Sequence, residues 1–302
     1  MFCGVPQGSI LGPLLFTLQI NDIDLQLNHC EIILYADDAV IYCAHKTSDN
    51  IESQLNTDID QVADWFAKNN LVANLKRTKT ECVLFGTSQR TSKSVPLEIK
   101  MNGQSITESK NYEYLGVILD KNLNFNEHLE KTFKKISSRI KLLSRVRQNI
   151  SPYTAETIYK VMILPVMLYC SNVFVGMTQS KKQRFETFQD RAMRIINGNR
   201  KSDAKLPRIN HLRNRLCALE VFKCLNGIVP KAFESYFTRN SHKMNTRNNN
   251  KIVVIQKVRT ETGRKTFSFQ GAKVFNNLPN NLQTETSLLR FKASSKDTNL
   301  DF

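Results

Sequence analysis

Residues 32–42 have the sequence Ile32-Ile33-Leu34-Tyr35-Ala36-Asp37-Asp38-Ala39-Val40-Ile41-Tyr42. Two apolar runs rich in β-branched and aromatic residues flank two adjacent acids, and such runs are typical of buried strands. The pattern predicts a β-hairpin with Asp37 and Asp38 at its tip. Two like charges this close raise each other's pKa unless a cation neutralises them. Carboxylate oxygens suit Mg²⁺, which takes one or two carboxylates together with substrate phosphates. A solvated acidic turn is the alternative interpretation.

A second motif lies upstream of this hairpin. The residues Gly4-Val5-Pro6-Gln7-Gly8-Ser9-Ile10-Leu11-Gly12-Pro13-Leu14-Leu15-Phe16 form a turn that is punctuated by glycine and proline, and Leu14–Ile20 continues an apolar helix expected to pack under a sheet. Together with Tyr35-Ala36-Asp37-Asp38, this motif resembles the palm of reverse transcriptases from non-LTR (LINE-like, jockey-type) retrotransposons. Intron maturases share the Tyr-Ala-Asp-Asp tip, but the Ser9–Leu15 sequence is closer to the retrotransposon branch.

The resemblance implies roles for residues in both motifs. Asp37 and Asp38 would be catalytic and would hold Mg²⁺ or Mn²⁺. The residues expected against template and incoming nucleotide are Pro6, Gln7, Gly8, Ser9, Tyr35 and Lys79, of which Lys79 could equally be an exposed turn lysine. The residues 112–120 resemble the strand that grips the primer end, with Tyr114, Leu115 and Gly116 at its centre. Gly116 in a strand suits close approach of another backbone or a bulge.

Charge is divided unevenly along the chain. The 302 residues carry a net charge of +16, with 43 bases and 27 acids. Residues 1–60 hold nine acids and one base, a net of −8, so the remainder holds 42 bases and 18 acids, a net of +24. An acidic metal pole and basic lobes suit a polymerase that holds a nucleic-acid backbone. A solvated basic surface without a partner is the alternative.

Several helices and strands are expected from periodicity. A helix is predicted from Ser48, as N-cap, to Asn69, because Ile51, Leu55, Ile59, Val62 and Phe66 fall three or four residues apart. A strand is predicted over Glu81–Phe85. The pair Asn102-Gly103 predicts a two-residue hairpin. A basic amphipathic helix is predicted over 126–150, with an apolar stripe of Leu129, Phe133, Ile136, Ile140 and Leu143. Its cations Lys134, Lys135, Arg139 and Arg145 are expected to contact nucleic-acid backbone. A membrane-surface helix is the alternative. Three further helices are predicted, one starting at Pro152, one over 181–197 and one over 211–226, and a buried helix is predicted within 161–177. A loop is predicted over 241–251 and a strand over 252–255.

The expected fold is α+β. A partial polymerase palm, an antiparallel sheet with helices, covers 1–120; a mostly helical thumb and connection covers 121–230; a basic C-terminal segment with loop, strand and short helices covers 231–302.

The seven scattered cysteines, without Cys-x-x-Cys, favour a reducing compartment. A zinc site from His29, Cys30, Cys43 and His45 lacks the usual ligand spacing. No signal peptide or membrane span is predicted, so an intracellular protein of nucleus or cytoplasm is expected, not a secreted one.

The resemblance implies an RNA-directed DNA polymerase that joins deoxynucleoside triphosphates to a DNA primer on an RNA template by two-metal nucleotidyl transfer. It also implies a third metal-binding aspartate on a strand before Gly4, so the sequence is expected to be an N-terminally truncated fragment, inactive alone. A non-enzymatic basic RNA- or DNA-binding protein derived from such an element, or a relic that folds poorly, are the alternatives. The sequence does not indicate an oligomeric state.

Overall fold

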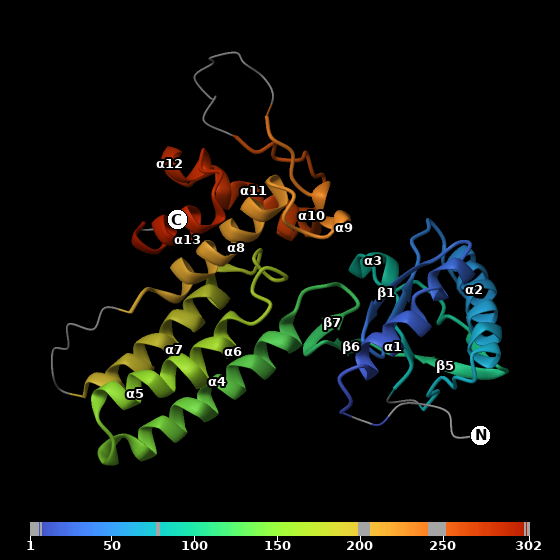
Figure 1. The fold of residues 1–302 in the computed structure, drawn as a ribbon, viewed down its shortest axis with the longest axis horizontal. Coiled ribbons are helices and arrows are strands. Elements are labelled where there is room, and N and C mark those ends of the chain that lie inside the picture. Colours follow the sequence, from blue (N-terminus) through green and yellow to red (C-terminus); the bar gives the residue numbers. More distant parts are fainter. Residues whose placement is uncertain are drawn as a thin grey trace. The chain divides into compact units, whose positions relative to one another are not determined.

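A computed structural model describes residues 6, 8–76, 79–198, 206–240, 252–298 and 300 (Figure 1). The chain forms two compact units, Met1–Leu123 and Asn124–Phe302. The first unit combines short strands with helices and the second is almost entirely helical, so the expected α+β class is confirmed. The predicted loop at 241–251 lies outside the described residues.

The first unit contains three small sheets rather than one antiparallel sheet. Strands β1 (Glu31–Tyr35) and β2 (Asp38–Tyr42) pair antiparallel. The second sheet has the order β3 (Glu81–Cys82), β5 (Gln104–Glu108), β4 (Ile99–Met101), in which β3 and β5 run parallel. The third sheet pairs β6 (Asn111–Tyr114) with β7 (Val117–Asp120). The expectation of one antiparallel sheet was therefore wrong, and β3 is shorter than the predicted Glu81–Phe85 strand.

The Asn102-Gly103 prediction is confirmed. These two residues connect β4 and β5, with Met101 opposite Gln104. Both have positive φ, 51° at Asn102 and 75° at Gly103. Such values match the right-handed twist of the flanking strands, and asparagine and glycine accept them at little cost.

Helices of the first unit pack on one apolar core. The helices are α1 (Gly12–Ile20), the short 3₁₀ helix η1 (Ile23–Gln26), α2 (Ser48–Lys68) and α3 (Ser88–Thr91). Leu55, Ile59 and Val62 of α2 are buried, as their spacing predicted. Thr47, rather than Ser48, is the N-cap of α2, and it makes no side-chain cap hydrogen bond. The predicted cap was therefore wrong by one residue.

Helix α1 differs from its prediction. Ile20 is buried and Phe16 is partly buried against the core, whereas Leu11, Leu14, Leu15 and Leu18 are exposed. The apolar residues lie all round this helix, and it contacts the core along one side only, so the other side stays in solvent. The expectation that its apolar residues pack under a sheet was wrong for most of them.

The second unit is built from helices. They are α4 (Asn126–Val146), η2 (Arg147–Asn149), α5 (Pro152–Ile158), the π-helical turn η3 (Tyr159–Ile163), α6 (Leu164–Leu168), α7 (Gln179–Asn197), α8 (Ile209–Leu225), α9 (Lys231–Glu234), α10 (Glu261–Lys265), α11 (Phe267–Asn276), α12 (Asn280–Gln283) and α13 (Leu288–Asp297). Ser151 caps α5 by accepting a hydrogen bond from the Thr154 N–H at 3.1 Å, as predicted. The helix expected within 161–177 is interrupted, because Pro165 cannot donate a backbone hydrogen bond and the chain leaves helical geometry after Leu168.

Two cores stabilise the second unit. The first contains the predicted stripe of α4, Leu129, Phe133, Ile136, Ile140 and Leu143, packed against α5–α7. The second joins α8 to the helices of the C-terminal region, across the boundary predicted at residue 230. The expected strand at 252–255 is only an isolated bridge between Val253 and Arg239. Within the described ranges, every helix is too short or too polar to cross a lipid bilayer.

Candidate functional site

The acidic hairpin is formed by β1 and β2. Tyr35 pairs with Asp38, so Ala36 and Asp37 make a two-residue turn and Asp38 begins β2. Ala36 adopts a φ of 51°, in the left-handed region that costs an L-residue roughly 1–2 kcal/mol. Asp37 and Asp38 are both exposed. The predicted strand–turn–strand arrangement is confirmed, but the strands are only half buried: in β1 exposed and partly buried residues alternate.

A buried carboxylate fixes the entrance to this hairpin. Asp58 of α2 is fully buried and accepts hydrogen bonds from the backbone N–H groups of Asn28 (3.2 Å), His29 (2.9 Å) and Cys30 (2.7 Å). Burial disfavours the charged form, but these three hydrogen bonds outweigh it and hold the pKa of Asp58 below its usual range. The segment that leads into β1 is thereby tied to α2.

The region compared with the primer-gripping strand is a hairpin. Leu115 and Gly116 form its turn, with φ of 46° and 78°, and Tyr114 lies opposite Val117. The single strand predicted over 112–120 was therefore wrong, because the left-handed pair reverses the chain. Burial raises the pKa of Tyr114 and the charge of Asp38 raises it further. This hairpin therefore lies within electrostatic reach of the acidic one.

Among the described residues, neither the upstream turn nor Lys79 bonds directly to the acids. Pro6 and Ser9 close a turn through the Ser9 N–H and the Pro6 carbonyl at 3.1 Å, and Gly8 has a φ of 83°. Gln7 lies outside the described residues. Lys79 is exposed, and in the described part of the chain no hydrogen bond or ion pair joins it or the Pro6–Ser9 turn to Asp37 or Asp38.

The donor set at the tip suits a hard divalent cation. Asp37 and Asp38 present two exposed carboxylates at adjacent positions, the ligand type that Mg²⁺ prefers. Over the residues that the structure describes, no three His, Cys, Asp or Glu side chains form a group that could hold a metal ion. The hairpin thus fits as part of a metal site, with remaining ligands to come from water, substrate or another carboxylate.

Helix α4 carries the cations expected to contact nucleic acid. Lys134, Lys135 and Arg145 are exposed on its surface. Arg139 instead donates to the Met162 carbonyl of η3. Arg147, which also belongs to the basic sequence 126–150, donates to the carbonyls of Ile195 and Ile196 at 3.0 Å each and closes the end of α7. These two arginines therefore have structural partners.

Comparison with known proteins shows which family the N-terminal part of the chain resembles. Residues 1–119 match the sequence model of the family described as "Reverse transcriptase (RNA-dependent DNA polymerase)". The chain is similar to the reverse transcriptases of non-LTR retrotransposons. It is 28% identical over 210 residues to the probable RNA-directed DNA polymerase from transposon BS of Drosophila melanogaster, covering 65% of this chain and 22% of that protein.

Two other similar proteins also come from retrotransposable elements. The RNA-directed DNA polymerase from mobile element jockey of Drosophila melanogaster is 28% identical over 205 residues, again 65% of this chain and 22% of the relative. The Pol polyprotein from type-1 retrotransposable element R1 2 of Nasonia vitripennis is 25% identical over 178 residues, 57% of this chain and 43% of the relative. The chain thus spans about a fifth of the length of the first two relatives. No solved structure gave a significant match.

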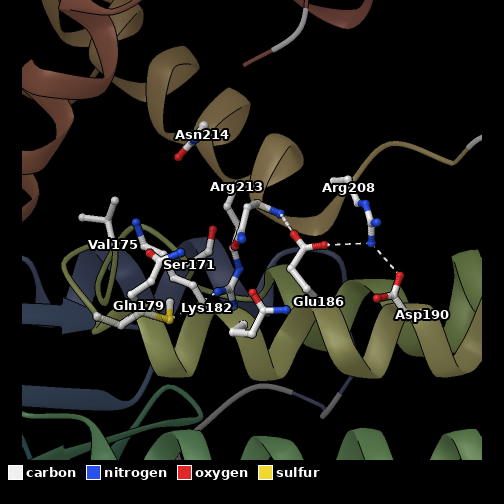
Figure 2. Close-up of a pocket in the computed structure, with 12 residues that line it drawn as sticks. Ser171, Val175, Gln179, Lys182, Glu186, Asp190, Arg208, Arg213 and Asn214 are labelled. Carbon is white, nitrogen blue, oxygen red and sulfur yellow. Dashed lines mark hydrogen bonds and ion pairs between the residues drawn. The ribbon is translucent and has the colours of Figure 1, made fainter. Parts of the chain in front are cut away.

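Sequence reasoning missed two features of this chain. Asp58 gave a signal, since it lies three residues after Leu55 and just before Ile59, on the apolar side of α2. The second feature is a cleft in the second unit, lined by Lys182 of α7 and Arg213 of α8 (Figure 2). These two cations look like ordinary members of basic helices, and only the packing of α7 against α8 brings them together.

Proposed function

We propose that this chain is part of an RNA-directed DNA polymerase of a non-LTR retrotransposon, with Asp37 and Asp38 as metal-binding residues. One observation carries the proposal: two exposed acids lie at the tip of a tight hairpin, within residues that match a reverse transcriptase family. An acidic turn with a purely solvent-facing role does not account for that combination.

The reaction would join the primer 3′-oxygen to the α-phosphorus of a deoxynucleoside triphosphate, while the bond from that phosphorus to the bridging oxygen breaks and pyrophosphate leaves. Asp37 and Asp38 would hold Mg²⁺ or Mn²⁺ at the tip. When bound, such ions activate the attacking oxygen and stabilise the leaving one.

Other residues would position the substrates. The Pro6–Ser9 turn and Tyr35 would lie against the template and the incoming nucleotide, and Lys79 would neutralise charge on the triphosphate. The β6–β7 hairpin with Tyr114, Leu115 and Gly116 would hold the primer end. Burial raises the pKa of Tyr114, and the nearby charge of Asp38 raises it further, which supports a place for this hairpin near the metal-binding acids. Lys134, Lys135 and Arg145 would contact the phosphate backbone of the template–primer duplex.

We also propose that residues 1–302 alone are inactive. Two adjacent carboxylates hold a metal ion less well than the three that the resemblance implies, and loss of preorganised charge stabilisation costs orders of magnitude in rate. A primer-extension assay on the purified chain tests this statement. Efficient Mg²⁺-dependent synthesis by residues 1–302 would refute it.

The site assignment is tested by joining these residues to the upstream part of a related element and measuring primer extension. Asp37→Ala should abolish synthesis without lowering the thermal midpoint. The control Asp64→Ala removes a carboxylate from the exposed face of α2 and should leave synthesis unchanged. Synthesis retained by Asp37→Ala would remove Asp37 from the site.

A second function has separate support. The exposed cations of α4 would allow a non-enzymatic protein to bind RNA or DNA. Salt-sensitive binding of a template–primer duplex, combined with no synthesis even in the joined protein, favours this alternative. Synthesis by the joined protein excludes it.

A further inference from the structure

The cleft between α7 and α8 has features of a built anion site. It has a volume of about 460 Å³, and its wall includes Ser171, Gln179, Lys182, Glu186, Arg208 and Arg213. All of these belong to the second unit, far in sequence from the acidic hairpin. Figure 2 shows Arg213 reaching from α8 towards α7, where Lys182 lies beside it.

Arg213 is a buried cation with unused hydrogen-bonding capacity. Its side chain is only 7% exposed, and its guanidinium stacks on the Phe185 ring at 3.6 Å. One terminal nitrogen donates to the Met167 carbonyl at 2.8 Å and the other to the Met177 sulfur at 3.5 Å. Its buried Nε has no hydrogen-bond partner among the residues that the structure describes. A buried donor without an acceptor is unfavourable, and an incoming anion would satisfy it.

Lys182 adds a second positive charge. It is half-buried, and in the described part of the chain its ammonium group has no hydrogen-bond or ion-pair partner. Burial lowers the pKa of Lys182, and the charge of Arg213 lowers it further. The nearby Cys217 supplies no compensating charge, because burial raises the pKa of its thiol to about 12.

The carboxylates of the cleft are already engaged elsewhere. Glu186 accepts from the Asn210 N–H at 3.0 Å with one oxygen and from Arg208 at 3.3 Å with the other. Asp190 accepts from Arg208 at 2.5 Å. Arg208 is therefore neutralised by two acids, and Glu186 acts on Arg213 only at longer range. The end of the cleft at Lys182 and Arg213 keeps an excess of positive charge.

We propose that this end of the cleft binds a phosphate group of a nucleic-acid strand, held between Lys182 and Arg213. A guanidinium fork with free N–H groups matches the geometry of phosphate oxygens, and the ammonium supplies a second charge-assisted hydrogen bond. The volume also accommodates the nucleoside next to that phosphate. The choice of a strand over a free nucleotide rests on the proposed function, whereas the phosphate site itself does not.

Calorimetric titration of the full chain tests the site with two probes. The dinucleotide UpU carries one internal phosphate diester and represents a strand, and uridine 5′-monophosphate represents a free nucleotide. UpU should bind, and Lys182→Gln should weaken its binding about tenfold or more, as expected for loss of a charge-assisted hydrogen bond. Lys182→Arg, which keeps the charge and the donors, should bind UpU nearly as well as the unmodified chain.

The matched control is Lys181→Gln. It removes the same charge from the same turn of α7, but Lys181 donates to Asn126 of α4 rather than to the cleft, so UpU affinity should change by less than about twofold. Lys182→Gln should also keep the thermal midpoint, because a half-buried ammonium without a partner stabilises nothing. Equal losses in Lys181→Gln and Lys182→Gln, or no UpU binding by the unmodified chain, would overturn the site.

Two further outcomes separate the sources of the ligand. Tighter binding of the monophosphate than of UpU would overturn the assignment to a strand, and equally tight binding of a glutamate-rich peptide would overturn the assignment to phosphate. The double variant Asp37→Ala/Asp38→Ala should bind UpU unchanged even where it abolishes synthesis. Failure of the metal site and failure of the cleft are therefore distinguishable.

Discussion

At the scale of single residues, Asp58 gives the sharpest prediction. Its carboxylate accepts three backbone hydrogen bonds from residues 28–30 and has no access to solvent. Asp58→Asn replaces one acceptor oxygen by a donor and leaves amides unpaired, so we expect a loss of about 1–3 kcal/mol in the free energy of unfolding. Urea unfolding measures it. Asp64→Asn on the exposed face of α2 is the control and should change it by less than about 0.5 kcal/mol. Equal effects would contradict the buried role of Asp58.

The same residue predicts a pH dependence of stability. Its pKa in the folded chain lies below the unfolded value of about 3.9, because the amide hydrogen bonds outweigh the cost of burial. Its contribution is therefore complete above the unfolded pKa and is lost as the pH falls through the folded pKa. Urea unfolding between pH 6 and pH 3 should show a smaller acid-induced loss in Asp58→Asn than in the unmodified chain. Parallel pH profiles would rule this contribution out.

Gly116 tests the turn of the β6–β7 hairpin. Its φ of 78° lies in the region that disfavours a side chain, so Gly116→Ala should lower the free energy of unfolding by about 1 kcal/mol. Gly116→Asn should cost less, since asparagine tolerates left-handed backbone better than alanine. Chemical unfolding compares the two variants. An alanine variant as stable as the asparagine variant would mean that the turn relaxes to another conformation.

At the scale of elements, α4 allows a matched comparison between neighbouring leucines. Leu143 is 1% exposed and belongs to the core, whereas Leu142 is 51% exposed on the other side of the helix. Leu143→Ala should cost about 2–5 kcal/mol through lost burial and the cavity left behind, and Leu142→Ala less than about 0.5 kcal/mol. Guanidinium unfolding of both variants checks this. Similar losses would contradict the orientation of α4.

Elements with strong local signals could be predicted from the sequence. The stripe of α4 and the Asn102-Gly103 turn followed from helical period and from residues that accept positive φ. Turns that lack asparagine or glycine at the left-handed position could not be predicted from the sequence. Ala36 and Leu115 adopt left-handed backbone that their side chains disfavour, so tertiary context imposes this conformation. The acidic hairpin has no glycine in its turn, and it was predicted because its sequence resembles that of reverse transcriptases. For β6–β7, the turn was missed.

Side-chain partners were less predictable than elements. Arg147 and Lys135 are both cations of one basic sequence, yet Arg147 closes the end of α7 and Lys135 faces solvent. The difference depends on which carbonyls lie within reach, and only the packing of α4 against α7 decides that. Lys182 and Arg213 meet for the same kind of reason, across α7 and α8.

At the scale of the whole molecule, the separation of charge predicts how the chain binds nucleic acid. Residues 1–60 have a net charge of −8 and the rest a net charge of +24, so binding should depend on the basic part. Each phosphate that a lysine neutralises releases counterions, and affinity then falls steeply with salt. Fluorescence anisotropy with a labelled RNA–DNA duplex, measured from low to moderate salt, should give a linear decrease of log affinity with log salt.

The slope of that line identifies the residues responsible. The double variant Lys134→Gln/Lys135→Gln should reduce its magnitude by about 2, roughly one unit for each lysine that contacts a phosphate. Lys46→Gln/Lys93→Gln removes the same charge from exposed positions of the first unit and should leave the slope within experimental error. Because both doubles change the net charge equally, a difference between them isolates contact from long-range attraction. Equal slopes would mean that α4 does not lie on the nucleic acid and that general attraction accounts for the binding.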